Sequence, residues 1–102
     1  MILVFCTTKD SEEAYNLANF LLDEKLIACA NIVPNIRSLY FWKGSKEDTN
    51  EYLLIMKTVE SKFPNLVKKI KEKHSYELPE IIAIPVSNAD PEYVKWIEES
   101  LS

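Results

Sequence analysis

The feature that most constrains the fold of this 102-residue chain is the stretch from Leu26 to Thr58. It holds two β-rich runs, Ile27–Trp42 and Glu51–Thr58, separated by the polar segment Lys43–Asn50, which contains the only glycine of the chain, Gly44. Glycine accepts the positive φ that a tight strand reversal often needs. The sequence therefore predicts a β-hairpin that turns near Gly44.

The length of this hairpin predicts how the chain assembles. A strand advances about 3.3 Å per residue, so an arm of roughly 15 residues extends about 50 Å. A compact domain of this size is only roughly 34 Å across. The hairpin should overhang its domain or bend, and Pro34-Asn35 is the expected bend because proline cannot donate to the strand ladder. The overhang would carry the apolar residues Leu39–Trp42, which predicts a homo-oligomer built through sheet edges.

The remaining sequence alternates between strand and helix patterns. Before the hairpin, the sequence predicts a strand at Ile2–Cys6 and a helix that is capped by Asp10 and ends near Asp23–Lys25. After the hairpin, it predicts a second helix capped by Ser61 and a strand at Ile81–Val86, which ends or lies at a sheet edge because of Pro85. A last helix is predicted to begin at Asp90-Pro91. The order β-α-β-β-α-β plus one helix is the ferredoxin-like pattern, an antiparallel four-stranded sheet with both long helices on one face. We expect a single α+β domain over residues 1–102.

Charge and cysteine content indicate which kinds of partner the protein can bind and in which compartment it is found. Sixteen acidic against twelve basic residues give a net charge of −4 without a basic stripe, which argues against nucleic acid and against an anionic membrane surface. No run approaches the ~20 apolar residues that span a bilayer, and the first residues lack a signal-peptide pattern. Two cysteines do not form the disulfide framework of small secreted domains. These features indicate a cytoplasmic protein with both thiols reduced.

The sequence contains no glycine-rich phosphate loop and no G-x-S-x-G motif, which argues against nucleotide binding, an organic cofactor and hydrolase chemistry.

His74, the only histidine, is either a helix-end residue that suits the helix dipole or a ligand for a soft metal ion. Cys6, at the end of the first strand, is either a core residue or a thiolate stabilised near a helix N-terminus. Lys57 either snorkels to the sheet edge or pairs with a carboxylate such as Glu80.

Motifs along the whole chain resemble those of the CutA divalent-cation tolerance proteins. The matching segments are Leu26–Asn31, Ser38–Gly44, Glu51–Thr58, His74–Ile81 and Tyr93–Trp96. The resemblance implies a ferredoxin-like trimer, similar in shape to the trimeric PII signalling proteins and associated with tolerance to copper and other divalent ions. It also implies metal ligation by Cys6 and His74. Lys73 stands where a second histidine can occur and is not carried over, because a protonated lysine is no ligand, and Ser75 replaces the usual proline.

Three functional hypotheses follow from these residues. The first is a non-enzymatic homotrimer that binds copper or another divalent cation through Cys6 and His74. The second is a PII-like signalling module that binds a small anionic metabolite in a cleft between subunits. The residues expected to line that cleft are Lys57, Tyr76, Glu80 and Trp42. The third, an enzyme with His74 as base and a glutamate as acid, is the least favoured because no nucleophile or oxyanion hole is identifiable.

Overall fold

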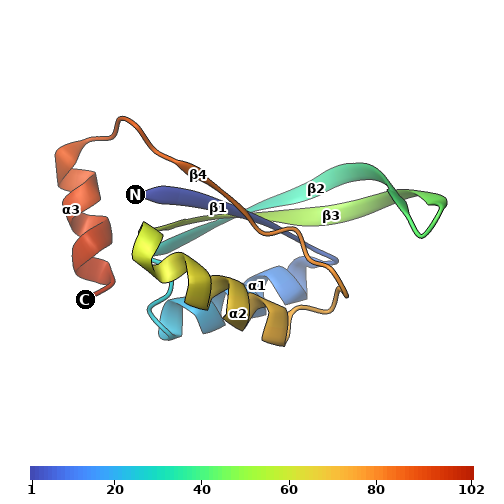
Figure 1. Cartoon of the computed structure of the whole chain (residues 1–102), viewed down its shortest axis with the longest axis horizontal. Helices are drawn as coiled ribbons and strands as arrows, with labels where there is room; N and C mark the ends of the chain where they lie inside the picture. Colours follow the sequence, from blue (N-terminus) through green and yellow to red (C-terminus); the bar gives the residue numbers. More distant parts are fainter.

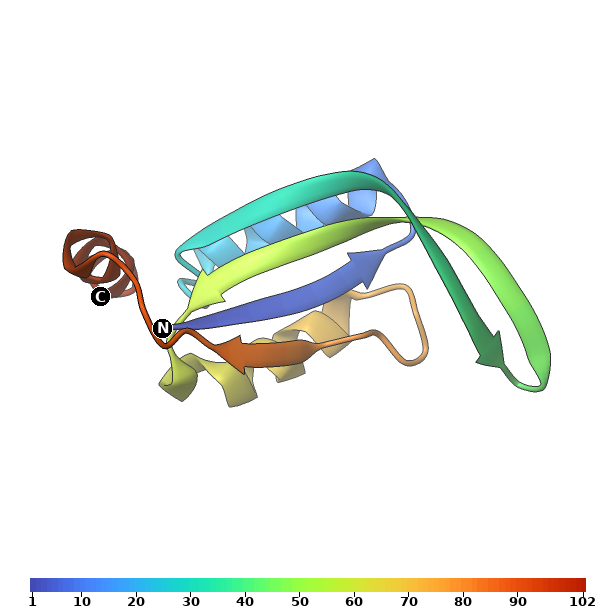
Figure 2. The same ribbon diagram turned by 90° about the horizontal axis from the view of Figure 1, so that it is seen from above.

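The structure, a computed structural model, describes all residues from Met1 to Ser102. Its elements are β1 (Ile2–Thr8), α1 (Ser11–Asp23), β2 (Cys29–Trp42), β3 (Ser45–Thr58), a short 3-10 turn η1 (Glu60–Lys62), α2 (Phe63–Lys73), β4 (Ile82–Pro85) and α3 (Pro91–Ser100). The four strands form one antiparallel sheet in the order β2-β3-β1-β4. Helices α1 and α2 cover one face of the sheet, and α3 lies at the end opposite the hairpin tip (Figures 1 and 2). The predicted α+β arrangement is confirmed.

The core lies between the sheet and the two long helices. Alternate residues of a strand point to opposite faces, so Val4 and Cys6 of β1 share the helix face with their pairing partners Met56 and Leu54 of β3. All four are fully buried. The helices contribute their apolar stripes to the same cluster: Ala14, Leu17, Ala18, Leu21, Leu66 and Ile70. The period-two and helical patterns of the sequence therefore located the core correctly.

The two arms of the hairpin differ from the prediction in opposite directions: β2 begins at Cys29 and not at Ile27, whereas β3 begins at Ser45 and not at Glu51. Both arms contain 14 residues, and the two-residue turn is Lys43-Gly44, with φ of 50° and 83°. The turn near Gly44 is thus confirmed, but Ser45–Asn50, expected to be part of the connection, forms strand opposite Arg37–Trp42. Polar side chains are tolerated here because most of this ribbon is exposed while its backbone groups still pair across the ladder.

The bend predicted at Pro34-Asn35 is present. The pairing register between β2 and β3 shifts between Val33 and Ile36, and Asn35 has a positive φ of 56°. Such a bulge bends its strand and increases the local twist. The distal part of the hairpin therefore extends past the body and bends toward the side on which β4 lies (Figure 2), and the molecule is 45 Å long but only 26 by 22 Å in section.

Several local predictions need correction. Ser61 does not cap α2, because it lies in η1, which leads directly into the helix so that Lys62 occupies the N-cap without a side-chain bond. Strand β1 continues past Cys6 to Thr8, which pairs with Tyr52. Strand β4 is an edge strand and ends at Pro85, as expected, but has only four residues. No helix in the chain has the length and apolar character needed to cross a membrane.

Candidate functional site

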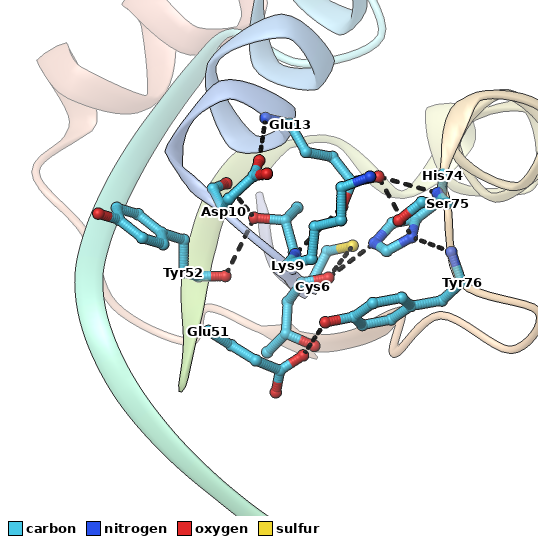
Figure 3. Close-up of polar contacts among 11 residues, drawn as sticks. Cys6, Lys9, Asp10, Glu13, Glu51, Tyr52, His74, Ser75 and Tyr76 are labelled. Atoms are coloured by element: carbon cyan, nitrogen blue, oxygen red, sulfur yellow. Dashed lines mark hydrogen bonds and ion pairs between the residues drawn. The ribbon is translucent and has the colours of Figure 1, made fainter. Parts of the chain in front are cut away.

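His74, the only histidine, is buried and connects three segments of the chain through its hydrogen bonds. His74 is the C-cap of α2, and its Nε2 atom lies 2.7 Å from the carbonyl oxygen of Thr7 at the end of β1. A carbonyl can only accept, so Nε2 carries the proton. The other ring nitrogen, Nδ1, accepts a hydrogen bond from the backbone N–H of Tyr76 at 3.0 Å. This pattern describes a neutral imidazole with both nitrogens engaged (Figure 3).

Cys6 lies beside this histidine at the end of the core. Its Sγ atom is 3.7 Å from the same Thr7 carbonyl oxygen, so the thiol and the imidazole N–H converge on one acceptor. Burial, and then the negative charges of Glu80, Glu13 and Glu51, raise the pKa of the Cys6 thiol to about 12. Of the two roles that the sequence left open for Cys6, the structure favours a protonated core thiol over a stabilised thiolate.

Glu13 fixes the segment that follows His74. Its Oε2 accepts from the Ser75 backbone N–H at 2.8 Å and its Oε1 from the Lys9 N–H at 3.1 Å. Partial burial raises the pKa of Glu13, but the hydrogen bonds from Ser75 and Lys9 outweigh it and hold the pKa below its usual value. In the sequence, Glu13 is recognisable only as the acidic residue three positions after the helix cap Asp10, whose Oδ1 accepts from the Glu13 N–H in the first turn of α1. Its role in anchoring Ser75 was therefore missed.

A pocket of about 680 Å³ opens between the curved hairpin and the loop Ser75–Glu80. Its lining residues are Thr7, Ser38, Leu39, Tyr40, Trp42, Glu51, Ser75, Tyr76, Glu77, Leu78 and Glu80. Three of the four predicted cleft residues, Trp42, Tyr76 and Glu80, are thus brought together. The Tyr76 hydroxyl donates to Oε2 of Glu51 at 2.6 Å, and Glu51 is only 4% exposed (Figure 3). Burial, the hydrogen bond to Glu51 and its charge raise the pKa of Tyr76.

The fourth predicted cleft residue, Lys57, is not in this pocket. Its Nζ atom lies 2.9 Å from Oδ1 of Asn31 and 5.7 Å from the centre of the Tyr93 ring, so within one chain it does not pair with Glu80. That Lys57 lines a cleft between subunits stays a prediction. Lys57 is six positions beyond Glu51 on β3, which is about 20 Å along a strand. The part of the pocket that one chain forms therefore has no basic lining residue.

The soft donors of Cys6 and His74 remain the candidate metal ligands. Nowhere in the chain do three or more histidine, cysteine, aspartate or glutamate side chains gather closely enough to hold a metal ion. A closed tetrahedral site needs four ligands. One chain alone therefore offers two candidate ligands at this position and no complete metal site.

The fold and the site together define a class: a small ferredoxin-like α+β protein with an extended, bulged hairpin and a buried cysteine and histidine at the end of β1. The model of the family described as "CutA1 divalent ion tolerance protein" matches residues 2–100. The chain belongs to this family.

Individual relatives agree with this assignment. The chain is 39% identical over 98 residues to the divalent-cation tolerance protein CutA of Thermus thermophilus, covering 96% of this chain and 95% of the relative. It is 40% identical over 99 residues to the chloroplastic protein CutA 1 of Oryza sativa subsp. japonica, covering 97% of this chain but only 56% of that relative. The chain thus spans about half the length of this plant protein.

The solved structures give the same result for the fold. The structure of the periplasmic divalent cation tolerance protein CutA of Archaeoglobus fulgidus superimposes with a TM-score of 0.96 at 38% identity, and each chain is covered completely. The CutA1 structure of Thermus thermophilus superimposes with a TM-score of 0.94 at 39% identity, covering 98% of each chain. The long hairpin and the terminal helix are therefore shared features of these proteins.

Proposed function

We propose that this chain acts in divalent-cation tolerance as a non-enzymatic homotrimer that binds copper or another divalent ion through Cys6 and His74. The observation that carries the proposal is the convergence of the Cys6 thiol and the His74 imidazole on the Thr7 carbonyl oxygen. Thiolate and imidazole are both good ligands for copper. The family description, divalent ion tolerance, supports the same class of ligand.

Metal binding would change the state of both side chains. For Nε2 of His74 to bind the metal, its proton would have to move to Nδ1, which breaks the hydrogen bonds to the Thr7 carbonyl and from the Tyr76 N–H. The buried Cys6 thiol would have to release its proton to solvent. Two ligands are fewer than a closed site requires, so water or a second subunit would complete the coordination. We therefore expect modest affinity.

Assembly into a trimer is supported by the face of the sheet that α1 and α2 leave uncovered. The apolar residues on that face are Leu3, Phe5, Leu53, Ile55, Ile82 and Ile84, placed there by the strand register. Val33 of β2, which pairs with Leu53, extends this face and is 37% exposed. A contiguous apolar surface of this kind marks an interaction site. Another copy of the chain is the occupant that we propose.

Copper titration tests the assignment of the ligands. We expect Cys6→Ser and His74→Gln to weaken copper binding at least tenfold, because each removes one soft donor. Cys29→Ser is the matched control, since Cys29 is the other free cysteine and its Sγ lies 3.9 Å from Lys57 Nζ, away from His74. Isothermal titration calorimetry gives the affinities, and thermal melting checks that each variant is folded. Unchanged affinity in both test variants would remove Cys6 and His74 from the metal site.

The pH dependence of copper binding provides a second test. The raised pKa of Cys6, about 12, means that the thiol is protonated at every pH between 6 and about 9. Copper that binds the sulfur must displace this proton, so the apparent affinity should rise about tenfold for each unit of increasing pH. A flat profile in a weakly coordinating buffer would show that the Cys6 sulfur is not a ligand.

The cytoplasmic location expected from the cysteine content is likewise a proposal. One relative is named as chloroplastic and one structural neighbour is described as periplasmic, so the compartment varies among the proteins that this chain resembles. Localisation of a tagged full-length protein by fractionation tests it.

A further inference from the structure

The pocket beneath the hairpin contains a buried carboxylate without a positively charged partner. Glu51 is 4% exposed and lines the pocket. Its Oε2 accepts one hydrogen bond, from the Tyr76 hydroxyl, while its Oε1 accepts none. No lysine, arginine or histidine nitrogen lies within ion-pairing distance of Glu51. A buried carboxylate is normally paired with a cation, so this oxygen is an available acceptor inside the pocket.

All charged residues that line the pocket are acidic. Glu77 and Glu80 line it together with Glu51, and no basic residue does. The one lysine that pairs with a lining carboxylate is Lys43, at the hairpin turn. Its Nζ atom lies 3.3 Å from Oε2 of Glu77, and both side chains are largely exposed. An anion would meet three carboxylates in this space, whereas a cation would be attracted. The lining of this pocket within one chain therefore favours a cation over an anion.

The walls of the pocket are aromatic and aliphatic. Trp42, Tyr40 and Tyr76 provide rings, and Leu39 and Leu78 provide aliphatic surface. Aromatic faces attract cations, and apolar walls with a few convergent polar groups are typical of small-molecule sites. The volume, about 680 Å³, is in the range of such sites. We propose that this pocket binds a small organic ammonium ion, whose N–H groups donate to Glu51 and whose apolar body packs against Trp42 and the two tyrosines.

An inorganic divalent cation fits this pocket less well. Although three carboxylates line it, they do not gather into a group able to hold a metal ion. Aromatic and aliphatic walls also contribute no oxygen ligands, which calcium and magnesium require. An organic cation uses both parts of the lining, the buried carboxylate and the rings, and so accounts for more of the pocket.

Three probes of matched shape and different charge test the proposal on the assembled protein. Phenethylamine is cationic, 2-phenylethanol is neutral and 3-phenylpropionate is anionic at neutral pH. We expect phenethylamine to bind, 2-phenylethanol to bind at least about tenfold more weakly, and 3-phenylpropionate not to bind, as measured by calorimetry or by chemical shift changes at Trp42. The tenfold ratio corresponds to the loss of a hydrogen bond to a charged group.

Variants of the pocket carboxylates test whether Glu51 accepts the hydrogen bonds of the ammonium group. Glu51→Gln keeps an amide oxygen that can accept from the Tyr76 hydroxyl but removes the charge, so it should weaken phenethylamine binding at least about tenfold. Glu12→Gln removes the same charge from an exposed position of α1 outside the pocket and should leave binding unchanged. If Glu51→Gln does not fold, Glu80→Gln, at an exposed lining position, should weaken binding several-fold.

The proposal fails if 2-phenylethanol binds as tightly as phenethylamine, or if Glu51→Gln binds the amine like the wild type. It also fails if phenethylamine does not bind at millimolar concentration, or if equimolar calcium displaces the amine. Cys6→Ser should leave amine binding intact, so this outcome is independent of the proposed copper site.

Discussion

Replacing Phe5 with aspartate is expected to convert the assembly into single chains. Phe5 lies on the uncovered face of the sheet, where it pairs with Ile55 of β3 and Ile82 of β4. A carboxylate at this position would be buried against the apolar surface of another copy, and an unpaired buried charge costs several kcal/mol. The fold of one chain should survive, because Phe5 is only half-buried in the isolated subunit.

Light scattering or sedimentation measures this effect directly. The wild type should have three times the 11.8 kDa mass of one chain, about 35 kDa, whereas Phe5→Asp should have the mass of one chain. Tyr15→Asp is the control, since Tyr15 is 63% exposed on α1 and its replacement should leave the mass unchanged. A wild type that remains a single 11.8 kDa chain at micromolar concentration would contradict the trimer.

The second large effect is expected in the core. Leu54→Ala should lower the free energy of unfolding by about 2–5 kcal/mol, because Leu54 is fully buried between the sheet and the helices and its truncation leaves a cavity. Unfolding by guanidinium chloride should be followed at one fixed protein concentration, since assembly makes stability concentration-dependent. Tyr15→Ala, at an exposed site, should change it by no more than about 0.5 kcal/mol. Equal effects of the two substitutions would contradict this location of the core.

Two proposed sites share one structural support. The segment from His74 to Glu80 leaves α2, passes the end of β1 and leads to β4 (Figure 2). Its first residue contacts Thr7 beside Cys6, and its third, Tyr76, donates to Glu51 in the pocket. Glu13 holds the segment between them by accepting from Ser75. The buried thiol and the acidic pocket therefore both adjoin this one anchored segment. Copper binding and amine binding can be measured on the same variants to compare the two proposed sites.

Much of the fold was predictable because its signals are local. Alternating burial at Ile2, Val4 and Cys6, the helical spacing after Asp10, and the proline and asparagine at the bend each depend on neighbours within a few residues. Where a local signal was weak, the prediction failed. Ser45–Asn50 is polar and was assigned to the connection, but it is strand because it pairs along the other arm of the hairpin.

The sequence by itself determined the order of strands and helices, the core face, and the positions of Cys6 and His74 near the ends of a strand and a helix. Only the tertiary structure decided which polar residues of β3 form a site. Glu51 and Lys57 are both charged residues of the same strand, β3. Glu51 became the buried acceptor because Tyr76, 25 positions away in sequence, folds over it, while Lys57 faces Asn31 and Tyr93. The physical reason is that backbone pairing fixes the face and position of a side chain along a strand, whereas the partner that it meets there comes from a distant segment.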